Sequence, residues 1–221
     1  MEPITAYEHF GLLAFFILSC GLSFIAWRWP EGKHRTFSQH VAVHKHRILY
    51  YILLFSIVLP LLLLFFIGWF VPVFHMSPWF SIFVVISSVA QYTCTLIPEV
   101  GGWKTKYHRA LAGVAAAALL PPLIFLLGVQ GISSLAIVVT VLSLGVMVAI
   151  IWQVIARKGA HSHLLYLQSG YFAAFFAAIL FAAYMMALSL AQCSKKGRND
   201  FFLWYVPTHE QRHNLTLKVV S

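Results

Sequence analysis

Histidine is the residue type with the most chemical potential in this chain. There are eleven histidines, and seven of them stand just before or at the start of an apolar segment. Those seven are His34, His40, His44 and His46, then His108, and finally His161 and His163. Imidazole nitrogens that converge at one depth can ligate haem iron or a first-row metal ion. His46, His108, His161 and His163 are therefore candidate ligands for a b-type haem.

A second histidine spacing and a carboxylate extend this hypothesis to a metal ion. His40 and His44 are four positions apart, which would place both imidazoles on one face of a helix, as many metal sites require. Glu99 follows Pro98 and precedes His108 by nine positions, so it could join such a site. The alternative interpretation is that the histidines lie at a membrane interface and interact with anionic lipid headgroups.

Long stretches without charge dictate where these residues lie. Residues 9–27, 48–98, 110–156 and 159–194 contain no Asp, Glu, Lys or Arg. One helical crossing of a bilayer takes about 20 apolar residues. The four stretches therefore predict six spans, at about 10–27, 48–70, 80–97, 108–127, 135–156 and 164–192. Because the chain is also 61% hydrophobic and only 10% charged, we expect an all-α, polytopic transmembrane helix bundle.

The composition predicts one membrane domain and one short tail. The membrane domain covers residues 1–192 with all six spans, and a polar, interfacial tail covers 193–221. His209–His213 in the tail matches the H-E-x-x-H pattern, in which two histidines bind zinc and the glutamate acts as general base. A third ligand and a substrate cleft are not evident in the sequence, so we interpret this match as an exposed polar turn.

Prolines are expected to shape the interior of the bundle. Pro60 falls inside the second span and should kink it, because proline removes one backbone hydrogen bond and clashes with the preceding turn. In the fourth span, small residues at Gly113–Ala118 permit close approach of a neighbouring helix, and Pro121 and Pro122 should break the outer half. Such kinks predict a cleft that binds or helps move a lipid-like or small apolar ligand without catalysis. The alternative function is a redox protein that holds b-type haem or a metal ion with the histidines above.

The basic residues orient the chain. The loops 28–47, 99–109 and 157–158 carry ten Lys and Arg residues, whereas the N-terminus and the loops 71–78 and 128–134 carry none. The positive-inside rule then places the N-terminus outside, and six spans bring the C-terminus outside too, although the tail is also basic. We expect a bacterial inner (plasma) membrane. The net charge of +9 fits this topology and anionic lipid rather than nucleic acid, so the expected partners are membrane lipids, with a homo-oligomer or a membrane complex as further options.

The loop between the third and fourth spans is the most distinctive one. It reads Thr-Leu-Ile-Pro-Glu-Val-Gly-Gly-Trp-Lys-Thr-Lys-Tyr-His over 95–108 and leads into an Ala-rich span. This loop resembles that of uncharacterised six-span bacterial membrane proteins, loosely similar to the damage-regulated autophagy modulator group, where we would expect it on the opposite face of the membrane. The resemblance implies a polytopic fold and no particular chemistry. It nominates Pro98, Glu99, Gly101 and His108 as site positions.

Overall fold

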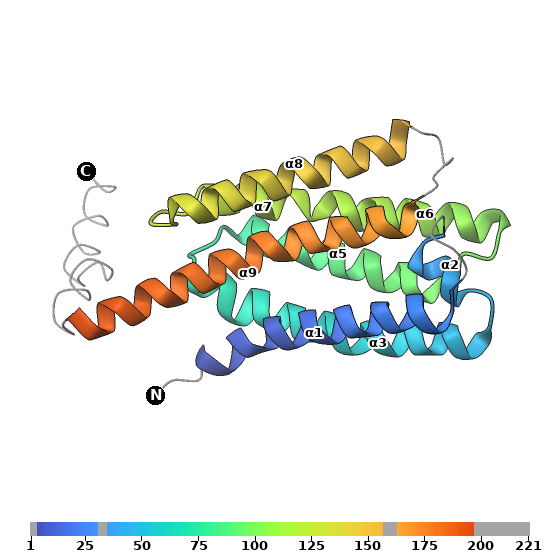
Figure 1. The fold of residues 1–221 in the computed structure, drawn as a ribbon, viewed down its shortest axis with the longest axis horizontal. Coiled ribbons are helices and arrows are strands. Elements are labelled where there is room, and N and C mark those ends of the chain that lie inside the picture. The colour runs from blue at the N-terminus through green and yellow to red at the C-terminus, as the bar shows by residue number, and fades with distance from the viewer. Residues whose placement is uncertain (1–3, 31–34, 157–162, 197–221) are drawn as a thin grey trace, which may run out of the picture. The chain divides into compact units, whose positions relative to one another are not determined.

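The chain folds into helices throughout its described part. The computed structural model describes residues 4–30, 35–156 and 163–196, and these ranges contain helices and no strand (Figure 1). The elements are α1 (Ile4–Arg28), α2 (Phe37–Val41), α3 (Lys45–Phe65), the π-helical turn η1 (Phe66–Phe70), α4 (Val71–Val73), α5 (Pro78–Leu96), α6 (Gly102–Ala118), α7 (Leu120–Leu127), α8 (Ser134–Ala156) and α9 (Leu164–Lys196).

Six helical segments in the described ranges are long and apolar enough to cross a membrane. They are His9–Arg28, Lys45–Val73, Pro78–Leu96, Gly102–Leu127, Ser134–Ala156 and Leu164–Leu188. The all-α, polytopic fold with six spans is thereby confirmed. The second and fourth segments begin earlier than the sequence predicted, because each helix continues into the basic residues that precede its apolar part.

The chain divides into two units, Met1–Ala182 and Ala183–Ser221. The first unit holds α1 to α8 and the first part of α9. The second holds the rest of α9, up to Lys196, followed by a tail outside the described residues. The expected boundary at 192–193 falls within α9, and the tail motif His209–His213 lies outside the described part of the chain, so the interpretation of that motif stays a prediction.

Glycines bring α1 close to α3. A Cβ atom added at Gly11 would lie 2.6 Å from the Phe65 ring, and one added at Gly21 would lie 2.6 Å from Leu54. Small residues allow such approach between membrane helices, where packing rather than hydrophobic burial holds helices together. The sequence predicted close approach at Gly113–Ala118. Gly113 itself meets open space, but Ala115 and Ala118 are buried, and Ser87 Oγ of α5 donates a hydrogen bond of 2.9 Å to the Ala115 carbonyl, so this stretch of α6 does lie close to a neighbouring helix.

The prolines have different effects on their helices. Pro60 lies inside α3, and the helix continues past it to Phe65 before it widens into η1. Pro121 and Pro122 do break the fourth span, because α6 ends at Ala118 and α7 starts at Leu120. Both prolines occupy the first turn of α7, where a missing backbone N–H breaks no helical hydrogen bond. The predicted break is therefore confirmed.

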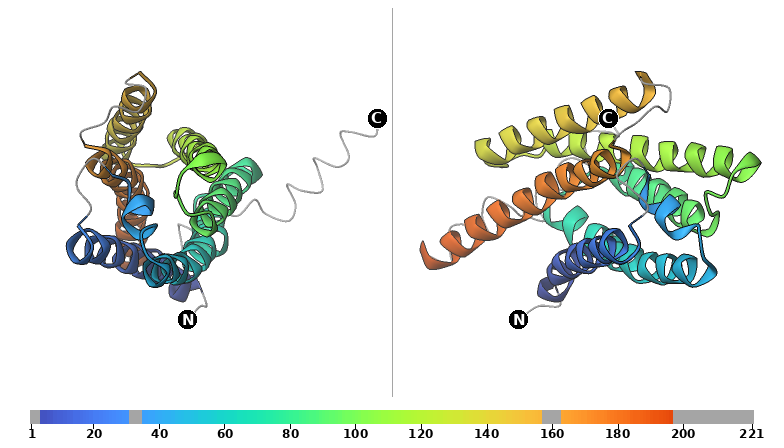
Figure 2. Two further views of the ribbon diagram at one scale, coloured as in Figure 1. Left: turned by 90° about the vertical axis from the view of Figure 1, so that its right-hand side faces the viewer. Right: turned by 45° about the vertical axis from the view of Figure 1, so that its right-hand side comes forward.

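The later helices join the bundle through side chains. The ring of Phe176 on α9 lies 5.3 Å from Phe15 on α1, and Tyr171 donates a hydrogen bond to the Ala116 carbonyl of α6. Helix α8 packs against α7 and has the smallest buried share of the six spans, 22%. End-on, the long helices surround the short α2 (Figure 2, left). Most of α8 is therefore exposed in the described chain, and α2 lies among the helix ends (Figure 2).

Candidate functional site

A glycine turn fixes Glu99 at one end of the bundle. Helix α5 ends at Leu96, Pro98 follows, and Gly101 and Gly102 adopt φ angles of 100° and 60°. Positive φ at two successive positions suits glycine and strains other residues. The turn is held by a hydrogen bond of 2.8 Å from the Gly101 N–H to Thr105 Oγ1. The chain thus reverses directly into α6, and this end of the bundle is here named the Glu99 end.

The Glu99 carboxylate is almost fully buried. Thr36 Oγ1 and Ser38 Oγ each donate a hydrogen bond of 3.2 Å to its Oε2 atom, and Arg109 Nε donates one of 2.9 Å to Oε1. The Glu99 side chain is 3% exposed, whereas that of Arg109 is 64% exposed. Glu99 is also the only acidic residue between positions 32 and 199. A charge of this kind is stable in a protein interior only when it is paired and hydrogen-bonded, and Glu99 is both.

Helix α2 supplies the hydroxyl partners of Glu99. Thr36 caps α2 in a reciprocal capping box, in which Gln39 N–H bonds Thr36 Oγ1 and Thr36 N–H bonds Gln39 Oε1. On the other side, Phe37 N–H donates a hydrogen bond of 3.1 Å to Gln168 Oε1 of α9. Phe37 and Val41 are buried. Polar contacts on α2 thus face Glu99 and α9, and its apolar side chains lie in the core.

Two predicted histidines are buried here, each with its own backbone partner. His40 is 1% exposed, and its Nδ1–H donates to the Thr36 carbonyl at 2.8 Å. His108 Nδ1–H donates to the Ile97 carbonyl at 2.7 Å. Each bond ties an imidazole to the chain turn beside it. Both histidines therefore stabilise the Glu99 end, and each does so through a different backbone carbonyl, that of Thr36 for His40 and that of Ile97 for His108.

Cys94 packs on the face of the His108 ring. Its sulfur lies 3.4 Å from Nδ1 and 3.3 Å from Nε2. A sulfur in the ring plane at equal distance from both nitrogens would collide with the carbon between them, so it lies above the ring. An activated thiol needs an in-plane hydrogen bond to an imidazole nitrogen. The pair is therefore arranged for packing rather than for nucleophilic catalysis.

The remaining candidate ligands are at the same end but do not converge. His44 and His46 stack at 5.5 Å on the surface, and His163 is exposed beside Tyr166. His161 lies outside the described residues. Among the residues that the structure describes, no group of three or more His, Cys, Asp or Glu could hold a metal ion. The sequence predicted histidines near Glu99, but the partners of its carboxylate are two hydroxyls and the Arg109 guanidinium. The haem or metal hypothesis stays a prediction.

The three prolines of the predicted cleft differ in burial. Pro60 is exposed, Pro121 is half-buried, and Pro122 is buried. Pro60 therefore faces away from the core of the bundle, whereas Pro122 faces into it. The sequence did not nominate Thr36 and Ser38, which donate hydrogen bonds to Glu99, or Gln168, which accepts one from the Phe37 N–H of α2.

A sequence signal for these missed partners exists in part. Thr36 and Gln39 have the spacing of a capping box, which marks the start of a short helix in the loop. The sequence contains no comparable signal for Gln168, because its contact depends on how α9 packs. Comparisons of this chain with protein-family models, with curated proteins and with solved structures each gave no match.

Proposed function

We propose that this polytopic membrane protein binds a lipid-like amphiphile at the Glu99 end, without catalysing a reaction. The supporting observation is the buried Glu99 carboxylate, which accepts hydrogen bonds from Thr36 and Ser38 of the short helix α2 and its cap. Glu99 lies in the loop between two spans, and a buried polar group is a more informative sign of function than an exposed one. Because the Arg109 side chain is 64% exposed, its ion pair with Glu99 contributes little to stability, so the pair alone gives little reason for a carboxylate at this position.

The chemistry of α2 indicates what kind of molecule fits. Its hydroxyls reach Glu99 through Thr36 and Ser38, and its apolar side chains Phe37 and Val41 fill the core. An amphiphile with hydroxyl or amine donors on its headgroup has the same division of polar and apolar parts. Such a headgroup would take over the hydrogen bonds to Glu99, and its chains would lie along the apolar helices.

The orientation and membrane are part of the same proposal. The basic residues Arg28, Lys45, Arg47, Lys104 and Arg109 lie at or next to the Glu99 end. By the positive-inside rule this end faces the cytoplasm, which supports an outside N-terminus and a bacterial inner membrane. The amphiphile would then come from the cytoplasmic leaflet.

The test measures the amphiphile that stays with the purified protein. We would extract the full chain in mild detergent and identify retained lipids by mass spectrometry, for the native chain, for Glu99→Gln and for Thr93→Ala. Thr93 is the control because its hydroxyl bonds only within α5, to the Val89 carbonyl at 2.8 Å. We expect about tenfold less retention in Glu99→Gln, the equivalent of about one charge-assisted hydrogen bond, and no change in Thr93→Ala.

A second variant changes retention in the opposite direction. Thr36→Val combined with Ser38→Ala removes the competing hydroxyls and should raise retention, because Glu99 then needs another donor. Equal retention in all variants, or none in the native chain, would overturn the proposal. A Soret band in the purified protein would overturn it in favour of the haem alternative.

A further inference from the structure

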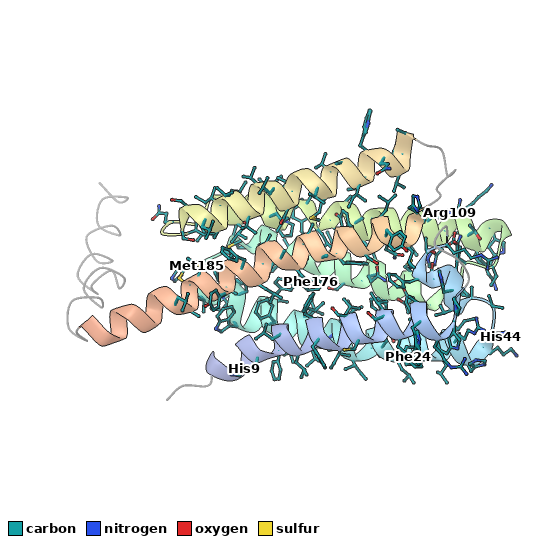
Figure 3. The ribbon with its side chains drawn as sticks, in the orientation of Figure 1. His9, Phe24, His44, Arg109, Phe176 and Met185 are labelled. Atoms are coloured by element: carbon teal, nitrogen blue, oxygen red, sulfur yellow. The ribbon has the colours of Figure 1, made fainter. Side chains whose placement is uncertain are left out.

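Two hydroxyl groups of α2 and its cap meet a single oxygen atom of Glu99. Thr36 Oγ1 and Ser38 Oγ each lie 3.2 Å from Glu99 Oε2, and they lie 2.8 Å from each other. The last separation is that of an O–H···O hydrogen bond. Figure 3 labels Arg109, the ionic partner of Glu99, at this end of the structure and His9 at the opposite end. The two hydroxyl oxygens and the carboxylate oxygen thus form a close triangle at the Glu99 end.

This triangle has the geometry of a carboxylate that holds a vicinal diol. In a vicinal diol the two hydroxyls stand on adjacent carbon atoms, and the staggered gauche form of that bond brings their oxygens to a separation similar to that of Thr36 and Ser38. Both hydroxyls can then donate to one acceptor, and an ionised carboxylate is an acceptor only. The chain presents to Glu99, from two residues, the pair of hydroxyls that a diol presents from one molecule.

The charge around Glu99 favours neutral hydroxyls over an ammonium group. Arg109 Nε donates a hydrogen bond of 2.9 Å to Oε1 and balances the charge of the carboxylate. Glu99 is the only acidic residue between positions 32 and 199, so this stretch has no second carboxylate for another cation. An ammonium at Oε2 would therefore be a charge without a partner beside a side chain that is 3% exposed, and such burial is costly. Two neutral hydroxyls occupy the same place without that cost.

The two hydroxyls belong to a helix that a ligand can displace. Helix α2 has five residues, and a helix of this length is not stable without contacts to its surroundings. The hydrogen bonds of Thr36 and Ser38 to Glu99 are among the contacts that hold it in place. A ligand with two hydroxyls replaces these bonds one for one, so the exchange leaves the buried carboxylate oxygen with its donors.

We propose that the Glu99 end selects amphiphiles whose headgroup carries a vicinal diol, which donates both hydroxyls to Glu99 Oε2 in place of Thr36 and Ser38. A glycerol headgroup and a sugar headgroup both provide such a diol. The proposal rests on the proposed function and narrows its ligand from any hydroxyl or amine donor to one arrangement of two hydroxyls. Amine headgroups, such as that of phosphatidylethanolamine, are then the weaker ligands.

The experiment varies the hydroxyls of the headgroup at constant charge. Native mass spectrometry of the full chain in mild detergent counts bound lipid from equimolar pairs with identical acyl chains. Phosphatidylglycerol carries a vicinal diol, phosphatidylpropanediol a single terminal hydroxyl and phosphatidylethanol no hydroxyl, and all three have the same phosphodiester charge. We expect the native chain to prefer phosphatidylglycerol about tenfold over phosphatidylethanol and about threefold over phosphatidylpropanediol, as hydrogen bonds to a charged group would give.

A pair of variants with the same change in charge tests the role of Glu99. Glu99→Gln and Glu8→Gln each remove one carboxylate, and Glu8 precedes His9 on α1, toward the opposite end (Figure 3). A neutral amide oxygen accepts a weaker hydrogen bond than a carboxylate, so Glu99→Gln should lower the preference for phosphatidylglycerol over phosphatidylethanol about fivefold. Glu8→Gln should stay within about twofold of the native chain.

A glucosyl diacylglycerol distinguishes the two sources of a diol. It is offered together with diacylglycerol of the same acyl chains, so that the two lipids differ only in the sugar. Enrichment of the glucosyl lipid on the native chain, lost in Glu99→Gln, would support a sugar diol. Preference for phosphatidylglycerol without such enrichment would support a glycerol diol.

The outcomes separate this proposal from the proposed function. Equal binding of phosphatidylglycerol and phosphatidylethanol, with no enrichment of the glucosyl lipid, would overturn the diol proposal. Equal binding of phosphatidylglycerol and phosphatidylpropanediol would overturn it too, because one hydroxyl would then suffice. A preference for phosphatidylethanolamine over phosphatidylglycerol would overturn it in favour of an amine and leave the proposed function standing. No retained lipid, or equal retention in the native chain and Glu99→Gln, would overturn the proposed function itself. The comparison among lipids uses the native chain, so it can be read even where a variant does not fold.

Discussion

The two ends of the bundle are held by different kinds of contact. At the Glu99 end, hydroxyls and a guanidinium converge on one carboxylate. At the other end, here named the Phe70 end, the buried side chains are aromatic. These are Phe65, Phe66, Trp69, Phe70, Phe74 and Phe80, each with at least one ring partner among the others. The Glu99 end is held by hydrogen bonds and an ion pair, and the Phe70 end by packing of aromatic rings.

The difference shows how a helix in lipid recognises its neighbours. Lipid tails are as apolar as leucine, so burial of apolar surface does not favour a neighbouring helix over lipid. Tight ring packing or polar contact has to provide the preference. The Phe70 end uses the first, through the six aromatic side chains named above. The Glu99 end uses the second, which is why a binding function is proposed there.

The largest effect should come from the Phe70 end. Phe70 is fully buried and stacks on Phe74 at 4.3 Å and on Phe80 at 5.5 Å. Phe70→Ala would leave a cavity that these rigid rings cannot fill, and we expect a loss of about 3 kcal/mol. The free energy of unfolding in mixed micelles would measure it. Phe16→Ala, at a ring that is 66% exposed, is the control, and an equal loss there would mean that ring stacking does not hold this end.

The Glu99 end should show a smaller but more local effect. Glu99→Ala removes the acceptor of Thr36 and Ser38, and we expect a loss of about 2 kcal/mol, in the range of hydrogen bonds to a charged group. Cys94 is buried beneath this end, so its reaction with a maleimide reports opening. In a chain with Cys20 and Cys193 replaced by serine, Glu99→Ala should raise the labelling rate of Cys94 about thirtyfold, the equivalent of that loss of about 2 kcal/mol.

Arg109→Ala separates the ion pair from the hydroxyl contacts. Because the Arg109 side chain is 64% exposed, its pair with Glu99 should be worth at most about 1 kcal/mol. Labelling of Cys94 should then rise far less than in Glu99→Ala. Equal acceleration in both variants would mean that the ion pair, not α2, closes this end.

The fold was predictable because charge is so unevenly distributed. Stretches such as 48–98 are too long and too apolar for a water-facing surface, so length alone sets the number of spans. The break at Pro121–Pro122 followed from backbone chemistry. Which face of a helix packs was not predictable in this way. Gly113 looked like a packing position and Gly11 did not, since composition does not say which glycine meets a neighbour.

The candidate site was predictable only in its central residues. Glu99 and His108 stood out because polar groups are rare near spans. The partners of Glu99 did not, because Thr36 and Ser38 are 63 and 61 positions away and reach it through a five-residue helix too short to show a hydrophobic period. We expected the histidines to converge because they lie at a common depth in the membrane. A common depth does not determine which neighbouring helix each side chain faces. His46 faces Trp29, whereas His108 faces Cys94.

Close helix packing gives the next prediction, intermediate in size. Gly11→Ala would place a methyl group against the rigid Phe65 ring, which belongs to the Phe70 end. We expect a loss of about 1–2 kcal/mol, as for overpacking in a core. Gly113→Ala meets open space and should be neutral or slightly stabilising, because alanine favours helix. Unfolding free energies of the two variants give the comparison, and similar values would remove close packing as a determinant of the Phe70 end.

The smallest effect should come from the middle of the bundle, between the two ends. Ser87 Oγ on α5 donates a hydrogen bond of 2.9 Å to the Ala115 carbonyl of α6, and Ser87 is buried. Hydrogen bonds between membrane helices average about 0.6 kcal/mol, so Ser87→Ala should lower the unfolding free energy by about that amount. Thr140→Val is the control, since the Thr140 hydroxyl bonds the Ala136 carbonyl of its own helix. A loss for Ser87→Ala as large as that for Glu99→Ala would mean that any polar contact between helices holds this bundle. The Glu99 end would then differ from the middle only in position, and the reason to place a ligand there would weaken with it.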